Sequence, residues 1–63
     1  MATEILIIDD NADIRNILDE LIQDAGYKTR LAANFNQGLA EIDKKLPDVA
    51  IIEVKLDKGD YDG

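Results

Sequence analysis

The stretch Ile5-Leu6-Ile7-Ile8-Asp9-Asp10 decides the fold of this chain. Its first four residues form a short, uninterrupted apolar run rich in isoleucine, which is typical of a strand covered on both faces. Two aspartates follow at the point where that strand would end. Ligands of open α/β sheets bind in the crevice outside the carboxyl ends of the parallel strands. The stretch therefore predicts an α/β fold with acidic side chains at its binding edge.

A second apolar run, Val49-Ala50-Ile51-Ile52, is followed by another acid, Glu53. We expect this run to be a buried parallel strand whose end lies beside the end of the first. Asp9, Asp10 and Glu53 would then share one crevice, where carboxylates repel one another unless a cation or a proton intervenes. Magnesium prefers oxygen ligands and commonly takes one or two carboxylates together with waters and phosphate oxygens. Asp10, Asp9 through a water, and a carbonyl beyond Glu53 could supply such a site.

Two helical patterns separate these runs. Asp10 or Asn11 can cap the first helix, and Gly26 can end it in a left-handed conformation. Its apolar residues recur at helical spacing and predict one continuous stripe: Ile14, Ile17, Leu18, Leu21, Ile22 and Ala25. Asn34 and Gln37 have the spacing of a capping box that opens the second helix. The apolar face of that helix comprises Phe35, Leu39, Ile42 and Leu46.

The remaining segments complete a β-α-β-α-β order. Residues 27–32 read as a strand whose Lys28 and Arg30 alternate with less polar residues, a pattern that suits a solvated edge. Gly38 falls near the apolar face of the second helix, where we expect close helix–sheet packing. Pro47 stops that helix, and Asp48–Val54 forms the third strand before a polar loop. Strands separated by helical crossovers should be parallel with right-handed connections.

Composition narrows the classes of function. The 63 residues carry a net charge of −7 and include no cysteine and no histidine. One small domain with a marginal core is expected, because so short a chain buries only about 60% of the surface its unfolded state exposes. Disulfides, Cys/His zinc sites and histidine catalysis are excluded. Contact of this segment with nucleic acid or membrane is not expected, and without a recognisable secretion signal we expect a cytoplasmic protein.

Taken together, these features resemble the CheY-like receiver domain of bacterial two-component response regulators. The matching stretches are residues 5–15 (ILIIDDNADIR), 24–27 (DAGY), 32–34 (AAN), 46–53 (LPDVAIIE) and 61–63 (YDG). The extended loop ending in Asp-Gly is most similar to regulators of the NtrX type. The resemblance implies a flavodoxin-like doubly wound sheet of strand order 2-1-3-4-5. Residues 1–63 would form its N-terminal half: strands 1–3 in order 2-1-3, helices 1 and 2, and the loop after strand 3.

The resemblance also implies a role in phosphorelay signal transduction, with a sensor histidine kinase as partner and no enzymatic turnover. The family's metal-binding acids match Asp9 and Asp10, and its main-chain ligand matches the Lys55 carbonyl. Together with Glu53 these are the expected metal-site residues, and weak Mg²⁺ binding is expected there. The family accepts phosphate on an aspartate, and this sequence has Glu53 at that position. Because phosphoryl transfer depends on geometry, we expect Glu53 not to be phosphorylated efficiently.

Strand 3 is central in the family, and in this half it would become an exposed hydrophobic edge. Either the chain is part of a longer regulator whose remaining half covers the strand, or two copies pair there antiparallel as a homodimer.

Two other functions stay open at this point. One is half of a Mg²⁺-dependent phosphatase, although the haloacid-dehalogenase arrangement has Asp-x-Asp and here Asp9 and Asp10 are adjacent. The other is a structural β-α-β-α-β self-association module without a ligand. A magnesium titration separates that module from a receiver, since only the receiver would respond.

Overall fold

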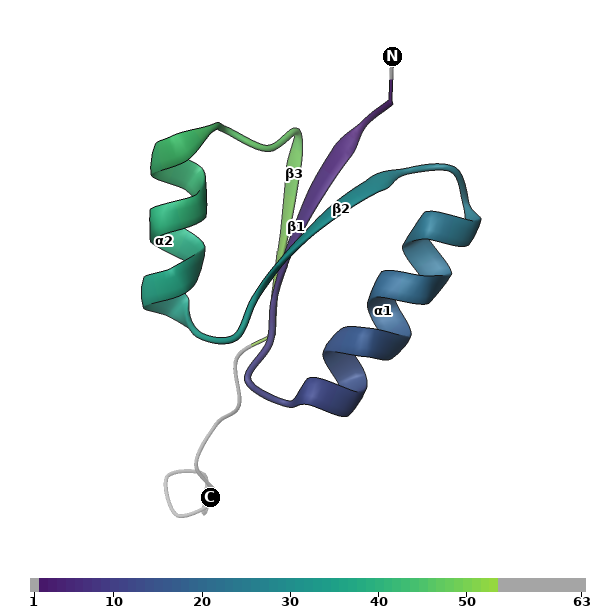
Figure 1. The fold of residues 1–63 in the computed structure, drawn as a ribbon, viewed down its shortest axis with the longest axis horizontal. Helices are drawn as coiled ribbons and strands as arrows, with labels where there is room; N and C mark the ends of the chain where they lie inside the picture. The colour runs from purple at the N-terminus through teal and green to yellow at the C-terminus, as the bar shows by residue number, and fades with distance from the viewer. Residues whose placement is uncertain (1, 54–63) are drawn as a thin grey trace, which may run out of the picture.

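The computed structural model describes residues 2–53, which form a three-stranded parallel sheet with a helix on each face (Figure 1). The elements are β1 Glu4–Ile8, α1 Ala12–Asp24, β2 Lys28–Ala32, α2 Phe35–Lys44 and β3 Val49–Ile52. The strand order is β2-β1-β3, and both pairs with β1 are parallel. The predicted α/β class, element order and 2-1-3 arrangement are confirmed.

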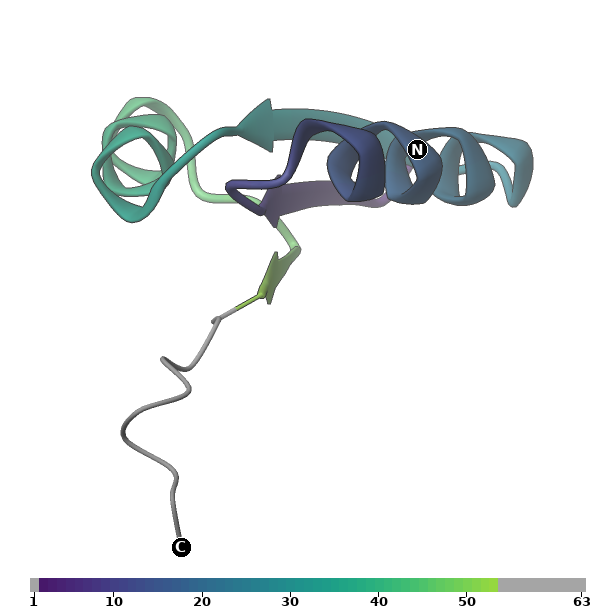
Figure 2. The ribbon, with the colours of Figure 1, turned by 90° about the horizontal axis from the view of Figure 1, so that it is seen from below.

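The core is centred on β1, as its continuous apolar run predicts. Leu6 and Ile7 are fully buried, and Ile5 and Ile8 are 8% and 4% exposed. Side chains of a strand alternate between the faces of the sheet. Leu6 and Ile8 pack with Ala32 and with Ile42 of α2. Hydrogen bonds tie Thr29, on the opposite face, to α1. In Figure 2 the two helices flank the sheet at its two sides.

The ends of α1 are set by local chemistry. The side chain of Asn11 caps the helix by accepting hydrogen bonds from the backbone N–H groups of Asp13 and Ile14, at 2.9 and 3.1 Å. Of the two candidate caps, the structure therefore selects Asn11. Gly26 has a φ of 98°, and its N–H donates to the carbonyl of Gln23. A left-handed glycine in this position ends many helices, because no Cβ opposes the conformation.

The start of α2 confirms the reciprocal bonding expected from Asn34 and Gln37. Asn34 Oδ1 accepts from the Gln37 N–H at 2.8 Å, and Gln37 Oε1 accepts from the Ala33 N–H at 2.9 Å. Gly38, one turn later, is buried against β1. A Cβ at this position would lie 2.2 Å from Ile8 Cδ1 and 2.8 Å from Ile8 Cγ1. The expected close helix–sheet packing at Gly38 is therefore present.

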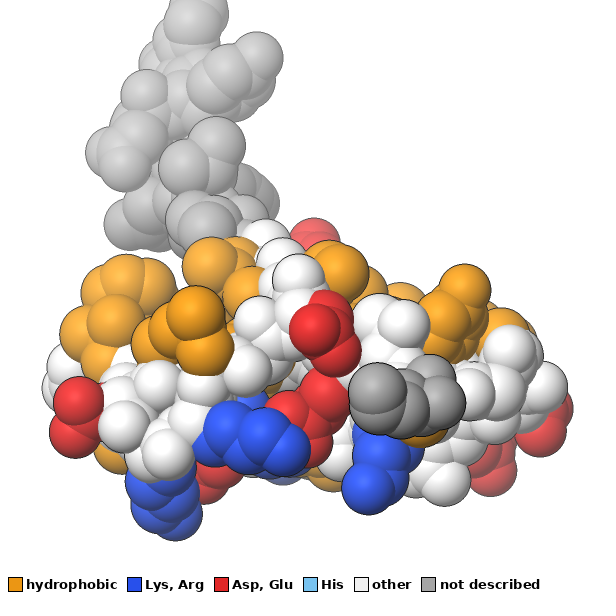
Figure 3. All heavy atoms as spheres, turned by 90° about the horizontal axis from the view of Figure 1, so that it is seen from above, with side chains coloured by type: hydrophobic (Ala, Val, Ile, Leu, Met, Phe, Trp, Pro, Cys, Tyr) orange, Lys and Arg blue, Asp and Glu red, His pale blue; other side chains and the backbone are white. Residues whose placement is uncertain are grey.

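Two expectations about burial and bounds are wrong, one for β3 and one for β2. β3 is shorter than the predicted Asp48–Val54, of which Val54 lies outside the described residues, and it is not buried: Val49 and Ile52 are each 47% exposed. β3 pairs with β1 on one side only, and no described element lies on its other side, so it has the exposed hydrophobic edge that was expected for this half of the sheet. The apolar stripe of α1 is likewise only partly covered, since Ile17 and Leu21 are 54% and 60% exposed. Hydrophobic side chains consequently gather along one side of the molecule (Figure 3).

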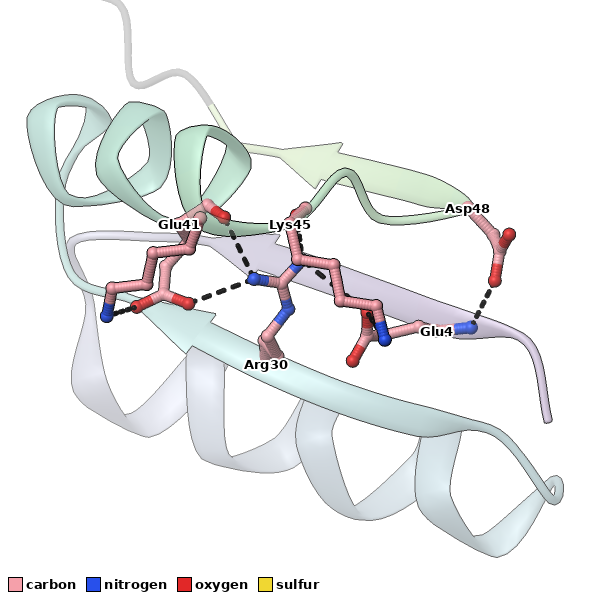
Figure 4. A network of polar contacts seen from close by, with 6 residues as sticks. Glu4, Arg30, Glu41, Lys45 and Asp48 are labelled. Atoms are coloured by element: carbon pink, nitrogen blue, oxygen red, sulfur yellow. Dashed lines mark hydrogen bonds and ion pairs between the residues drawn. The ribbon is translucent and has the colours of Figure 1, made fainter.

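The second correction concerns β2, which begins at Lys28 rather than Tyr27 and whose Arg30 is not a solvated edge charge. The Arg30 side chain is 17% exposed and forms ion pairs with Glu4 and Glu41, at 3.5 and 3.1 Å. It also donates to the carbonyls of Glu41 and Lys45 near the end of α2 (Figure 4). Arg30 therefore fastens the C-terminus of α2 to the sheet, because the unpaired carbonyls of a helix end favour a cation.

Candidate functional site

The backbones of Asp9 and Glu53 lie side by side at the carboxyl edge of the sheet. Ile8 is paired with Ile52 in the β1–β3 register, and the Glu53 N–H donates to the Ile8 carbonyl at 3.0 Å. The Asp9 N–H donates to the Ala32 carbonyl of β2 at 3.1 Å. The two acidic residues that follow β1 and β3 thus meet at the same rim, as expected from parallel strands.

Of the acidic residues at this rim, Asp9 is buried, whereas Asp10 and Glu53 are exposed. The exposed fraction of Asp9 is 2%. Asp9 Oδ1 accepts from the Asn11 N–H at 2.9 Å, and the Asp9 carbonyl accepts from Arg15 Nη1 at 2.7 Å. Asp9 Oδ2 is buried and has no hydrogen-bond partner within the described part of the chain. A buried carboxylate oxygen without a partner is unusual, and a cation is one kind of group that satisfies it.

The side chains of Asp10 and Glu53 line a common open hollow of about 480 Å³. Its other lining residues are Ile8, Asn34, Phe35 and Ile52. Asp10 and Glu53 therefore line the same hollow, whereas Asp9, which is buried, is not one of its lining residues. Sequence reasoning did not assign Asn34 or Phe35 to this rim. The available signal was the cap at Asn34, since a helix that starts where β2 ends begins at the same edge of the sheet.

The amino-acid sequence that forms this rim is similar to known proteins. The profile of the response regulator receiver domain matches residues 5–63. This chain belongs to the receiver domain family. The chain is 35% identical over 60 residues to a putative response regulator NtrX-like from Rickettsia bellii, covering 95% of this chain and 13% of the relative.

Two further relatives agree with this assignment. The nitrogen assimilation regulatory protein NtrX of Azorhizobium caulinodans is 35% identical over 63 residues, which cover 100% of this chain and 14% of that protein. Sporulation initiation phosphotransferase F of Bacillus subtilis is 39% identical over 56 residues, or 89% of this chain and 45% of that protein. The chain thus spans less than half the length of each of these relatives. No solved structure matches.

Receiver domains commonly bind Mg²⁺, and the rim described above offers part of what that ion requires. Mg²⁺ takes hard oxygen ligands, and Asp9 and Asp10 supply carboxylates of which Asp9 Oδ2 has no other described partner. Within residues 2–53, however, no three acidic side chains come together as a metal-binding group. The fourth expected ligand, the Lys55 carbonyl, lies outside the described residues. The metal site with Asp9, Asp10, Glu53 and Lys55 therefore stays a prediction.

Away from the rim, two carboxylates of this receiver domain are held in the charged form. Hydrogen bonds from Thr29 and Gln23 lower the pKa of Asp19 below its usual value. Lys44, and then Arg30, lower the pKa of Glu41. These bonds connect α1 and α2 with β2, so they stabilise the scaffold rather than the rim. No helix of the described residues is long and apolar enough to cross a membrane.

Proposed function

We propose that residues 1–63 form the N-terminal half of a receiver domain that acts in phosphorelay signalling without accepting phosphate efficiently itself. The observation that carries this proposal is the position of Glu53. It follows β3 directly, and its N–H is bonded to Ile8, the residue before Asp9. The resemblance to receiver domains assigns the phosphoacceptor to that position, and the chain has a glutamate there.

Glutamate differs from aspartate in the geometry on which phosphoryl transfer depends. Its carboxylate lies one methylene further from the backbone, and misplacement of a reacting group by about 1 Å can lower a rate about 100-fold. A phosphoryl group carries a charge of about −1.5 to −2 and three acceptor oxygens, so a single carboxylate mimics it only in part. We therefore propose that the chain signals by binding a partner rather than by turnover.

In this proposal Mg²⁺ binds weakly at Asp9, Asp10 and the Lys55 carbonyl, with Glu53 adjacent. When bound, the ion would neutralise negative oxygens at the rim. The buried Asp9 Oδ2, which has no hydrogen-bond partner among residues 2–53, supports this assignment. The expected partner is a sensor histidine kinase or another protein of the same signalling system.

A second candidate is supported by the exposed apolar surface. β3 contains only apolar residues, and its Val49 and Ile52 are each 47% exposed. An open hydrophobic edge is an association site. The rest of a longer receiver would cover it, and so would a second copy of this chain. A structural self-association module without ligand would need this surface and not the acidic rim.

The test of the leading proposal compares the chain with its Glu53→Asp variant. Each is incubated with acetyl phosphate and Mg²⁺, and intact mass spectrometry follows a gain of about 80 Da. In the reaction a carboxylate oxygen attacks phosphorus and acetate leaves. We expect no labelled species for the chain as it stands. Labelling of Glu53→Asp is expected, because it restores the shorter side chain at the end of β3.

The matched control is Glu20→Asp, the same chemical change at an exposed position of α1. It should leave the chain unlabelled. A clear adduct mapped to Glu53 in the unaltered chain would overturn the proposal. A Mg²⁺ titration followed by NMR separates the second candidate, for which no resonance near Asp9 or Asp10 would move at millimolar Mg²⁺.

A further inference from the structure

Arg15 is the basic residue that contacts the acidic rim, and the function proposed above does not use it. It lies in the first turn of α1, where the helix dipole disfavours a cation. Its guanidinium is nevertheless turned back six residues along the chain, and Nη1 donates to the Asp9 carbonyl at 2.7 Å. A residue that breaks a local preference in this way usually has a compensating role in the tertiary structure.

The hydrogen bond from Arg15 holds the backbone of Asp9, whose carboxylate is itself bonded to the Asn11 N–H. Asp9 has three hydrogen bonds in the described structure: its N–H to the Ala32 carbonyl, its Oδ1 from Asn11, and its carbonyl from Arg15. The first anchors Asp9 to β2, and the second sets the turn that leads into α1. The third is made by the side chain of another residue, so a substitution at Arg15 can remove it and leave Asp9 itself unchanged.

We propose that Arg15 is a positioning residue for divalent-cation binding at this rim, acting through the Asp9 backbone. This inference rests on the proposed Mg²⁺ site. By holding the Asp9 carbonyl, Arg15 fixes the 9–11 turn, and with it the orientation of the Asp9 carboxylate and the exit of Asp10 toward the hollow. Groups that orient metal ligands commonly change metal affinity about 10- to 100-fold when they are removed.

Two effects of Arg15 on a bound cation have opposite signs, and this makes the proposal testable. As a positive charge near the rim, Arg15 repels Mg²⁺, so its removal would tighten binding. As a brace for Asp9, it favours binding, so its removal would weaken it. The proposal states that bracing dominates, because the bond is short and joins Arg15 directly to the backbone of Asp9, whose carboxylate would bind the ion.

The experiment titrates MgCl₂ into the chain, into Arg15→Met and into the control Lys28→Met, followed by two-dimensional NMR. Lys28→Met removes the same charge from an exposed residue at the opposite end of the sheet. Arg15→Met should bind Mg²⁺ about 10-fold more weakly than the chain, and Lys28→Met should bind as the chain does. Equal or tighter binding by Arg15→Met would overturn the proposal.

A second readout needs no metal. The Asn11 N–H is bonded to Asp9 Oδ1, so its amide hydrogen exchange should be faster in Arg15→Met than in the unaltered chain. The Gly38 N–H, which is bonded at the start of α2, serves as the reference amide whose exchange should not change. Unchanged Asn11 exchange would refute the brace even if Mg²⁺ bound. If the chain bound no Mg²⁺ but Asn11 exchange rose, the brace would stand and the metal site would fail. Should Arg15→Met not fold, Arg15→Lys retains the stem and charge without the planar fork and takes its place.

Discussion

Replacing Gly38 by alanine has two effects of opposite sign on the stability of the fold, and their sizes can be compared. Alanine favours a helix interior over glycine by about 0.8–1.0 kcal/mol, so propensity alone predicts a more stable α2. The added Cβ, however, would lie 2.2 Å from Ile8 Cδ1 and 2.8 Å from Ile8 Cγ1. Overpacking of a tight core costs about 1–3 kcal/mol. We expect Gly38→Ala to destabilise the chain by about 1 kcal/mol.

The clash cannot be relieved by the tip of Ile8 alone. Rotation about χ2 moves Cδ1 but leaves Cγ1 in place, and the χ1 of a β-branched residue is stiff. Ile8 is 4% exposed, so its side chain has little free space around it. Either α2 moves away from the sheet or Ile8 shifts. Because the Ile8 carbonyl accepts from Glu53, a shift would also disturb the acidic rim.

The assay is urea unfolding followed by circular dichroism, arranged as a double-mutant cycle with Ile8→Val. The single Ile8→Val change removes Cδ1 and should cost about 0.5–1.5 kcal/mol. Combined with Gly38→Ala, the total loss should be smaller than the sum, by about 1 kcal/mol, since removal of Cδ1 relieves the closer of the two contacts with the Cβ. Asn36→Ala, an exposed change in the same helix, reports propensity alone.

Two outcomes would refute this reasoning. Gly38→Ala could stabilise the chain by the full propensity gain of about 1 kcal/mol. Alternatively, the changes in unfolding free energy of the two substitutions could be strictly additive. In that case the Ile8 side chain is not what excludes a side chain at position 38.

Two further predictions follow from the polar contacts and the open edge. Thr29→Val should lower stability by about 1 kcal/mol near pH 6, because it removes the hydrogen bond that chiefly lowers the pKa of Asp19 in a solvent-screened setting. A lowered folded-state pKa stabilises above the unfolded value of about 3.9 and is lost as the pH falls through the folded value. The difference between Thr29→Val and the unaltered chain in urea midpoints should therefore shrink below pH 4, and a constant difference down to pH 2 would contradict this. If two copies pair antiparallel about the centre of β3, Asp48 of each lies opposite Glu53 of the other, so light scattering should show more dimer at about 1 M salt than at low salt. A dimer that weakens as salt is added would exclude that register.

Much of the scaffold could be predicted because its signals are local. The cap at Asn34 and Gln37, the left-handed Gly26 and the end of α2 before Pro47 each depend on residues within a few positions of one another. The apolar run of β1 likewise predicts burial on both faces, since no alternation marks a solvated side. From these, the parallel order and the shared rim of Asp9 and Glu53 follow through the topology rules for α/β folds.

The details of the rim and the edges were decided only by the tertiary structure. Asp9 is buried and bonded to Ala32, Asn11 and Arg15, and these contacts arise only where β1, β2 and α1 meet in space. The pairing of Arg30 with Glu4 and Glu41 joins β2 both to α2, the next element, and to β1, which is distant in sequence. Exposure of β3 depends on which elements lie beside it. Hydrogen-bond partners and covering layers are set by neighbours in space, and a linear pattern of residues does not specify them.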